Sequence, residues 1–376
     1  MNRVAGAGRR VALVLGSSTG GVGRHVASLA AGLVADGVAV TVCGPAATES
    51  QFGFERVGAR FVAVEIPAAP GLADAGSVRA LRSVLRVDGA VDVVHAHGLR
   101  AGLVASLARP PGRPLVVTWH NLSLAAGLRG EVYRHLERYT ARAADVTLGV
   151  SPDLVQRARH YGARDARLAV VPAPARQPPV RRPDEVREEF GVEPGQPLVL
   201  AVGRLHPQKG HDTLIAAAAS WRHRVPPPAV VVAGSGPEYL RLASLVSVSE
   251  APVRLLGHRE DIPDLLAAAD VVVSTSIWEG NPLFLQEAIR AGAPLVATAV
   301  GGVPDLVGDA AILVPPRDAD AVDVAVSRLL DDPGLREEYA RRGRARAATW
   351  PTEADAVASV EALYTELTRT RTPERR

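Results

Sequence analysis

The chain has 376 residues, of which 47% are apolar, so two globular domains are expected rather than one or three. Its single cysteine, Cys43, excludes an intrachain disulfide and a cysteine-rich metal cluster, which favours a reducing cytoplasm. No apolar run reaches the ~18–20 residues of a membrane-spanning helix. The apolar stretch 11–15 is too short for a signal-peptide core and predicts a strand.

The net charge of +3 is unevenly distributed, because residues 1–183 carry +11 and residues 184–376 carry −8. A basic half indicates an anionic partner such as a membrane surface, a phosphorylated acceptor or nucleic acid. An arginine-rich genome composition is the alternative explanation. Lys209 is the only lysine, and since arginine would serve for ordinary surface charge, a functional role is predicted for it.

In the first half, short β-branched runs alternate with amphipathic helical patterns, which predicts a parallel, doubly wound sheet. The expected strands are 11–15, 38–42, 60–64, 91–95, 115–119, 146–150 and 168–171. The expected helices are 22–35, 78–86, 99–108, 130–143 and 153–161.

A proline-rich segment, 172–183, follows and is interpreted as an interdomain linker. The alternation then resumes with strands expected at 198–202, 230–233, 253–256, 271–274, 295–297 and 311–313. Helices are expected at 212–221, 238–246, 262–268, 283–291, 319–330, 335–348 and 352–367. The predicted domains are 1–177 and 178–350, then a helix over 351–367 and a disordered tail over 368–376. Two similar halves around a hinge predict a ligand-binding cleft.

A glycine-rich turn, Gly16 to Gly23, follows the first strand and opens a helix. Such a turn lets backbone N–H groups approach a phosphate or sugar, and Gly20 and Gly21 are the candidates. The spacing matches neither a dinucleotide fingerprint nor a P-loop, so a purely structural turn is the alternative. His25 is interpreted as a helix-face residue.

Two histidines follow predicted strands at the edge where open α/β sheets place functional groups. His97 lies in the segment VVHAHG and His120 in VVTWHN. His120 is expected to contact a sugar hydroxyl or a reacting group, and both residues are assigned to the acceptor side. A structural role for each is the alternative.

The segment AVGRLHPQKG places Arg204 and Lys209 in one short loop between a strand and a helix. Two fixed cations there suit a diphosphate, whose negative charge must be neutralised when it leaves. Farther along, Glu279 stands before a helix start and Glu287 lies in its second turn. Helix-start N–H groups can hold a phosphate, Glu287 can accept from ribose hydroxyls, and Glu279 from sugar hydroxyls.

Two other motifs are set aside. The sequence Asp318-Ala-Asp320 resembles a metal-binding pair but fits a helix N-cap better. The turn Gly234-Ser-Gly236-Pro237 lacks the third glycine of a dinucleotide site, and Pro237 fits the first position of a helix.

These motifs resemble glycosyltransferase family four, whose members have the GT-B fold. The resemblance covers nearly the whole chain and is strongest between 201 and 307. It implies an α/β protein of two facing, Rossmann-like, doubly wound domains with an interdomain cleft. It also implies that the N-terminal domain binds the acceptor, the C-terminal domain binds a nucleotide sugar, and the last helix crosses back to the first domain.

The resemblance implies residue roles as well. Gly20 and Gly21 would lie against the donor diphosphate, which Arg204 and Lys209 would bind. Glu279 would contact the transferred hexose, Glu287 would bind the ribose, and His120 would sit beside the sugar. The loop around His258 and Arg259 would frame the base. The other expected donor-binding residues are Gly280, Asn281, Pro282 and Leu283. The catalytic candidates are Glu279, Arg204, Lys209 and His120.

The expected reaction moves a hexose from a nucleotide-diphosphate sugar to an unidentified acceptor with retention at the anomeric carbon. No metal or other cofactor is expected, because Arg204 and Lys209 would neutralise the leaving group. Nucleic acid is not an expected partner. The basic helix with Arg79, Arg82 and Arg86 suggests an anionic or lipid-linked acceptor, so a cytoplasmic protein peripheral to the inner face of the membrane is expected.

Three alternatives stay open. Another GT-B enzyme, such as a sugar epimerase or phosphorylase, is the first, and product analysis would separate it. A nucleotide-binding oxidoreductase is the second, which the missing dinucleotide spacing disfavours. A catalytically silent partner protein is the third, which the intact set of Arg204, Lys209, Glu279 and Glu287 disfavours.

Overall fold

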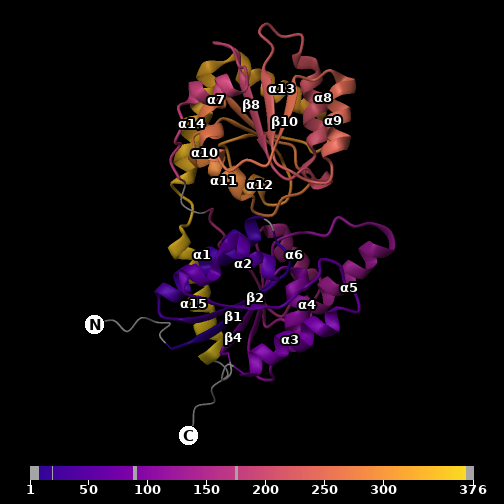
Figure 1. Cartoon of the computed structure of the whole chain (residues 1–376), viewed down its shortest axis with the longest axis vertical. Coiled ribbons are helices and arrows are strands. Elements are labelled where there is room, and N and C mark those ends of the chain that lie inside the picture. The colour runs from indigo at the N-terminus through magenta and orange to yellow at the C-terminus, as the bar shows by residue number, and fades with distance from the viewer. Residues whose placement is uncertain (1–7, 19, 88–90, 174–176, 370–376) are drawn as a thin grey trace, which may run out of the picture. The chain divides into compact units, whose positions relative to one another are not determined.

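The computed structural model describes residues 8–18, 20–87, 91–173 and 177–369 (Figure 1). The chain folds into two compact units, each with its own sheet and core. The first unit comprises residues 1–174 together with 351–376, and the second comprises residues 175–350. The last segment of the chain therefore belongs to the same unit as the first.

The first unit contains a parallel seven-stranded sheet of order β3-β2-β1-β4-β5-β6-β7. Its strands are β1 (Arg10–Leu15), β2 (Ala39–Gly44), β3 (Arg60–Ala63), β4 (Val93–His97), β5 (Leu115–Trp119), β6 (Val146–Gly149) and β7 (Ala166–Leu168). Almost every residue of the central strands is buried, as expected for a parallel sheet that helices cover on both faces.

The helices of the first unit are α1 (Gly21–Ala35), α2 (Ala46–Phe52), α3 (Asp74–Val87), α4 (Leu99–Ala108), α5 (Gly127–Ala143), α6 (Pro152–His160) and α15 (Glu353–Arg369), with a 3₁₀ turn, η1 (Phe54–Val57). The C-terminal helix α15 packs beside α1 (Figure 1). It buries Val357, Val360, Leu363 and Tyr364 in the core that α1 and the sheet form. Gly32 of α1 permits this approach, because a Cβ there would lie 2.3 Å from a Val357 methyl group.

The second unit contains a parallel six-stranded sheet of order β10-β9-β8-β11-β12-β13. Its strands are β8 (Leu198–Val202), β9 (Ala229–Ala233), β10 (Val253–Gly257), β11 (Val271–Ser274), β12 (Leu295–Thr298) and β13 (Ile312–Val314). Its helices are α7 (Pro183–Glu189), α8 (His211–Trp221), α9 (Tyr239–Ser249), α10 (Ile262–Ala268), α11 (Leu283–Arg290), α12 (Val303–Val307), α13 (Ala319–Asp331) and α14 (Pro333–Ala347), with a 3₁₀ turn, η2 (Pro207–Lys209). Apolar clusters cover both faces of the sheet.

The predicted α/β class with two Rossmann-like, doubly wound domains is confirmed. Some element bounds differ from the prediction. The strand expected at 91–95 is β4 and runs to His97, and the strand expected at 168–171 is β7, over residues 166–168. The last helix ends at Arg369, so residues 368 and 369 are helical rather than part of the predicted tail, whose remainder, 370–376, lies outside the described residues.

In each sheet the strand order reverses beside the first strand of that unit. This happens between β1 and β4 in the first unit and between β8 and β11 in the second. Open α/β sheets bind ligands beyond the carboxyl ends of the strands at such a switch point. The loops after these four strands are therefore the places where each unit can hold a functional site.

Candidate active site

The core of the site in the second unit is an ion pair between two predicted residues. Lys209 ends the 3₁₀ turn after β8, and Glu279 lies in the loop after β11. Lys209 Nζ lies 2.5 Å from Glu279 Oε1, and the Ser276 hydroxyl donates to the same oxygen at 2.6 Å. Glu279 is only 7% exposed, so the lysine and the serine compensate a buried carboxylate.

Hydrogen bonds connect the three loops that follow β8, β11 and β12 around this ion pair. The Gln208 backbone carbonyl accepts a hydrogen bond from the Ile277 N–H at 2.8 Å, and the Gln208 side-chain amide donates one to the Trp278 carbonyl at 2.9 Å. The Thr298 hydroxyl donates to the Ser276 carbonyl at 2.6 Å, and the Gly302 N–H donates to the Glu279 carbonyl at 3.0 Å. The position of Glu279 is therefore fixed from both neighbouring loops.

Two glycines make this close assembly possible. Gly210 has φ +59°, and a Cβ there would lie 2.2 Å from the Thr275 carbonyl oxygen. Gly301 has φ +51°, and a Cβ there would lie 1.9 Å from the Glu279 carbonyl oxygen. Both positions combine a left-handed backbone with a backbone approach that any other residue would block.

Arg204 lies on the same edge of the sheet, directly after β8. Its side chain is exposed, and no hydrogen bond or ion pair of the described residues involves its guanidinium. The backbone beneath it is held firmly, because the buried ring of His211 donates from Nε2 to the Arg204 carbonyl at 3.2 Å. Burial lowers the pKa of His211 to about 4, so this ring is neutral. The exposed Arg204 guanidinium is therefore available to a ligand, while the Arg204 backbone is held in place by His211.

The turn after β9 supports the same loop. Without side chains, Gly234 and Gly236 let the backbone pass close to the Gly203 and Leu205 carbonyl oxygens, which a Cβ would meet at 1.9 Å and 2.3 Å. The prediction that Pro237 is the first residue of a helix is wrong, because α9 begins at Tyr239 with Glu238 as its N-cap. These glycines have a packing role in shaping the Arg204 loop.

Helix α11 begins directly after the Glu279 loop, and its N-cap residue, Pro282, makes no side-chain cap. Its N-terminus is therefore suited to an anion. Gly280 and Leu283 flank this start. Asn281 is held in place, because its side-chain oxygen accepts from Gln286 at 2.8 Å. Glu287 lies half-buried in the second turn of α11.

His258 and Arg259, the two residues expected to frame the base, lie in different environments. His258 is exposed, with its Nε2 4.0 Å from a Glu260 carboxylate oxygen. Arg259 binds Glu189 at 2.8 Å and Asp261 at 2.6 Å, and these carboxylates raise its pKa. The Arg259 guanidinium also lies over the Phe190 ring, 5.7 Å from its centroid. Arg259 is therefore held by ion pairs within the protein, whereas the exposed His258 side chain is available to a ligand.

In the first unit, the glycine-rich turn after β1 divides into two parts. Gly23 is required by packing, because a Cβ there would lie 2.1 Å from the Phe52 ring. Gly20, the N-cap of α1, has open space where a Cβ would be, and Gly21 is the first helical residue. Among the described residues, nothing would meet a Cβ at Gly20, so packing does not require a glycine there.

Four histidines meet at the adjoining ends of β4, β5 and α1. His97 Nδ1 and His120 Nε2 are 3.2 Å apart, and the His25 ring lies edge-on to both, with centroid distances of 5.7 Å. His95 and His97 rings are 4.2 Å apart. His25, interpreted from the sequence as a helix-face residue, is buried in this cluster.

The histidines of this cluster are neutral. Burial lowers the pKa of His25 to about 4 and that of His95 to about 3, and burial together with the neighbouring rings lowers those of His97 and His120 well below 6.5. His95 bonds the Tyr364 hydroxyl at 2.6 Å and the Thr118 hydroxyl at 2.7 Å. Sequence patterns did not indicate Tyr364, because only the fold brings α15 to β4.

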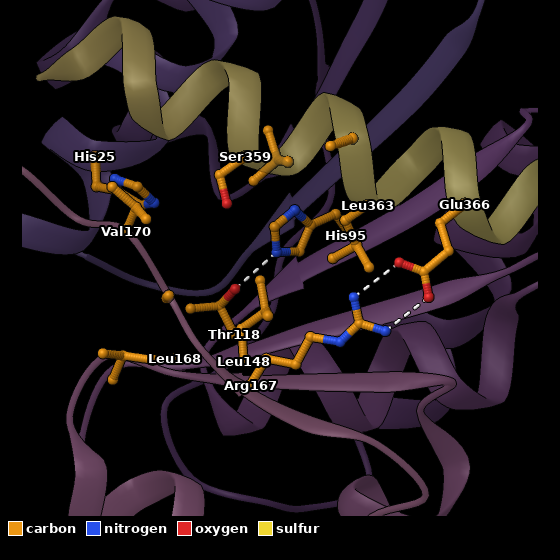
Figure 2. A pocket seen from close by; sticks show the side chains of 13 residues that line it. His25, His95, Thr118, Leu148, Arg167, Leu168, Val170, Ser359, Leu363 and Glu366 are labelled. Carbon is orange, nitrogen blue, oxygen red and sulfur yellow. Dashed lines mark hydrogen bonds and ion pairs between the residues drawn. The ribbon is translucent and has the colours of Figure 1, made fainter. Parts of the chain in front are cut away.

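A cavity of about 150 Å³ adjoins this cluster within the first unit. Figure 2 shows His25 and His95 in its wall beside Ser359 of α15. An ion pair between Arg167 and Glu366, with distances of 2.7 and 2.8 Å, also lines the cavity (Figure 2). The cavity lies between α15 and the strands it covers.

The acidic motif of the second unit has the structural role that its sequence favours. Asp318 Oδ1 accepts the Ala321 N–H at 2.9 Å and caps α13. The N-cap interpretation of Asp318 is therefore confirmed.

Comparison with known proteins agrees with the two-unit fold. The family model for a glycosyl transferase 4-like domain matches residues 20–174, and that for glycosyl transferases group 1 matches residues 183–346. D-inositol 3-phosphate glycosyltransferase from Salinispora arenicola is 34% identical over 310 residues, which are 73% of this chain and 68% of that protein. The chain belongs to the glycosyl transferases group 1 family.

The family assignment makes this protein an enzyme of the glycosyltransferase class. Solved structures share its fold at low sequence identity. Sucrose-phosphate synthase from Thermosynechococcus elongatus has a TM-score of 0.79 at 22% identity over 96% of this chain and all of that chain. Anabaena HepE in complex with UDP-glucose also has a TM-score of 0.79, at 19% identity over 95% of this chain and 99% of that one. The glycosyltransferase therefore has the predicted GT-B fold.

Among the described residues, none of the helices combines the length and the apolar composition that crossing a bilayer would require.

Several supporting residues of the site were not predicted, including Ser276, Thr298, Gln208 and His211. Ser276 stands three residues before Glu279, a spacing that could have indicated a partner for a buried carboxylate. The others required knowledge of which loops are neighbours.

Proposed function

We propose that this glycosyltransferase moves a hexose from a nucleotide-diphosphate sugar to an acceptor with retention at the anomeric carbon. The observation that carries the proposal is the Lys209–Glu279 pair at the switch point of the second unit, with exposed Arg204 on the same edge. Two cations and an uncapped helix start suit a diphosphate, and a fixed carboxylate suits sugar hydroxyls. HepE, a relative in fold, is a UDP-glucose complex, which supports a nucleotide sugar.

In this proposal each part of the site has a distinct task. Arg204, Lys209 and the N-terminus of α11 are assigned to the diphosphate, and so are Gly20 and Gly21. Glu279 orients the hexose, and Glu287 accepts from the ribose. His258 and the loop around it border the base. His120, which is hydrogen-bonded to His97, is assigned to the sugar and acceptor side.

The donor is tested by thermal unfolding of the purified protein with UDP-, GDP-, ADP- and dTDP-sugars. A ligand at about 100 times its Kd should add about 2.7 kcal/mol to the free energy of unfolding. One nucleotide family should stabilise the wild type and the control Glu337→Ala, whose exposed glutamate lies on α14. Glu287→Ala should lose that stabilisation. Equal stabilisation of Glu287→Ala would contradict the ribose assignment, and no shift with any donor would contradict the donor site.

The proposed chemistry is a front-side displacement. The bond between the anomeric carbon and the diphosphate oxygen breaks, the acceptor oxygen bonds to the same face, and the leaving diphosphate takes the acceptor proton. Arg204 and Lys209 stabilise the charge that develops on the leaving group, so no metal is needed. Donor turnover should therefore persist in excess chelator. Complete loss of turnover that Mg²⁺ restores would contradict this part of the proposal.

We further propose that the acceptor is anionic, carrying a phosphate or lying at an anionic membrane surface. The first 183 residues carry +11, and the exposed side chains of Arg79, Arg82 and Arg86 form a basic row on α3. The Salinispora relative is named for a phosphorylated acceptor, inositol 3-phosphate, which is consistent with this charge. The basic first half of the chain would attract such a substrate over a Debye length of about 8 Å at physiological salt.

A further inference from the structure

The four-histidine cluster in the first unit is connected to the C-terminal helix through a continuous series of contacts. Tyr364 of α15 bonds His95 Nδ1, the His95 ring lies against the His97 ring, and His97 Nδ1 bonds His120 Nε2. The Thr118 hydroxyl holds the second nitrogen of His95, as Figure 2 shows. His97 is therefore supported by a ring that is fixed at both of its nitrogens.

The hydrogen bond between His97 and His120 has a definite direction, which the other nitrogens decide. Each neutral ring carries one N–H, so one ring must donate and the other must accept. His97 Nε2 is buried and has no hydrogen-bond partner among the described residues. A proton there would leave a buried N–H unpaired, which is rarer and costlier than an unpaired acceptor. The proton of His97 therefore belongs on Nδ1, the atom that faces His120.

We propose that His97 is a positioning residue that donates from Nδ1 to Nε2 of His120 and so fixes His120 in its Nδ1-protonated tautomer. His120 Nδ1 makes no hydrogen bond to a described residue and is not among the buried unpaired atoms. Its N–H is consequently available to a ligand. The partner it fits is a hydroxyl or phosphate oxygen that accepts a hydrogen bond.

This assignment limits what His120 can do, and it deepens the proposed function, on which its relevance to sugar transfer rests. With Nε2 occupied by His97 and Nδ1 carrying a proton, neutral His120 has no free lone pair. It orients a sugar or acceptor oxygen as a donor and does not serve as the base. Removal of the acceptor proton is left to the departing diphosphate.

The tautomer can be measured without any sugar. The full chain is labelled with [¹⁵N]histidine, and long-range ¹H–¹⁵N spectra are recorded at pH 7.5, with His120 assigned by loss of its signals in His120→Asn. The expected wild-type pattern has the His120 proton on Nδ1 and an unprotonated Nε2. A proton on Nε2 overturns the proposal. Failure of donor binding in the thermal-unfolding test would instead remove the proposed function and leave this result intact.

Variants separate positioning from packing. His97→Phe keeps a ring against His95 but removes the hydrogen bond, so His120 should show both tautomers. His97→Asn, whose amide N–H can take the place of Nδ1–H, should restore the single Nδ1-protonated form. His25→Phe is the control, because His25 touches the same ring without a hydrogen bond, and it should leave the pattern unchanged. A folded His97→Phe protein with an unchanged single tautomer overturns the role of His97. If His97→Phe does not fold, the wild-type and His97→Asn spectra decide.

Discussion

Glu279 and Lys209 depend on each other in the second unit. The Glu279 carboxylate is buried, and its Oε1 receives both the Lys209 ammonium and the Ser276 hydroxyl. A buried charge that loses its partner destabilises the fold, whereas loss of both charges is tolerated much better. Lys209 therefore has a structural task in addition to its proposed contact with the diphosphate.

The two tasks of Lys209 can be separated with a single variant and a double variant. Lys209→Met should lower kcat for the identified donor by about 10²–10³-fold, the usual effect of removing one group that stabilises developing charge. It should also destabilise the fold, and adding Glu279→Gln should recover most of that stability without recovering turnover. Denaturant unfolding and initial rates of the single and double variants measure both effects. Recovery of turnover in the double variant would contradict a role for Lys209 at the leaving group.

The sequence indicated Lys209 and Glu279 separately, by the uniqueness of the lysine and by the position of the glutamate before a helix. It could not show that the two side chains touch, because 70 positions separate them and only the pairing of β8 with β11 brings them together. The same reason hid Tyr364, which reaches His95 across 269 positions. Contacts across a sheet depend on strand order, which a single sequence does not reveal.

The loop between β11 and α11 holds its shape because a glycine follows β12. Gly301 combines a left-handed φ of +51° with a close backbone approach, because a Cβ there would lie 1.9 Å from the Glu279 carbonyl oxygen. Gly257 has a similar φ of +75° but open space around its Cβ position. The two glycines thus separate the effect of backbone strain from the effect of steric contact.

Gly301→Ala should therefore be more harmful than Gly257→Ala. The control variant should lose about 1–2 kcal/mol, the cost of a left-handed alanine. Gly301→Ala should lose more and should also weaken donor binding, since the Glu279 loop must move. Thermal unfolding and donor titration of both variants provide the comparison. Equal losses in the two variants, with unchanged donor binding, would show that the contact does not constrain the loop.

Regular elements were predicted well where a periodic pattern had clear ends. Helices α4 and α10 and strand β5 have the bounds expected from the sequence. Helix α7 was missed because it begins at Pro183, inside a segment whose many prolines suggested a linker. Proline is favourable in the first turn of a helix, where its missing N–H has no partner to lose. Strand β7 was misplaced because only three residues pair.

The net charge is unevenly distributed along the chain. The two halves of the chain have net charges of opposite sign, +11 and −8. On α3, the side chains of Arg79 and Arg86 are exposed and take part in no ion pair of the described residues. Arg254 of β10 is exposed in the same way in the second unit.

The proposed attraction to anionic surfaces predicts which arginines matter. Vesicles containing an anionic lipid should sediment the wild type and Arg254→Gln equally, and salt should weaken binding of both. The double variant Arg79→Gln, Arg86→Gln should bind about thirtyfold more weakly, since each arginine near the surface contributes about 1 kcal/mol. Equal binding of the wild type to neutral vesicles would remove the electrostatic explanation.

The division of the chain into units also determines an order of folding during synthesis. The first unit is discontinuous, because residues 351–376 belong to it and the whole second unit is inserted between its two segments. The ribosome therefore completes the second unit before it makes Tyr364 and the other core residues of α15. Until then the first unit exposes the apolar surface that α15 later covers, and the nascent chain is most vulnerable to aggregation and proteolysis in that interval.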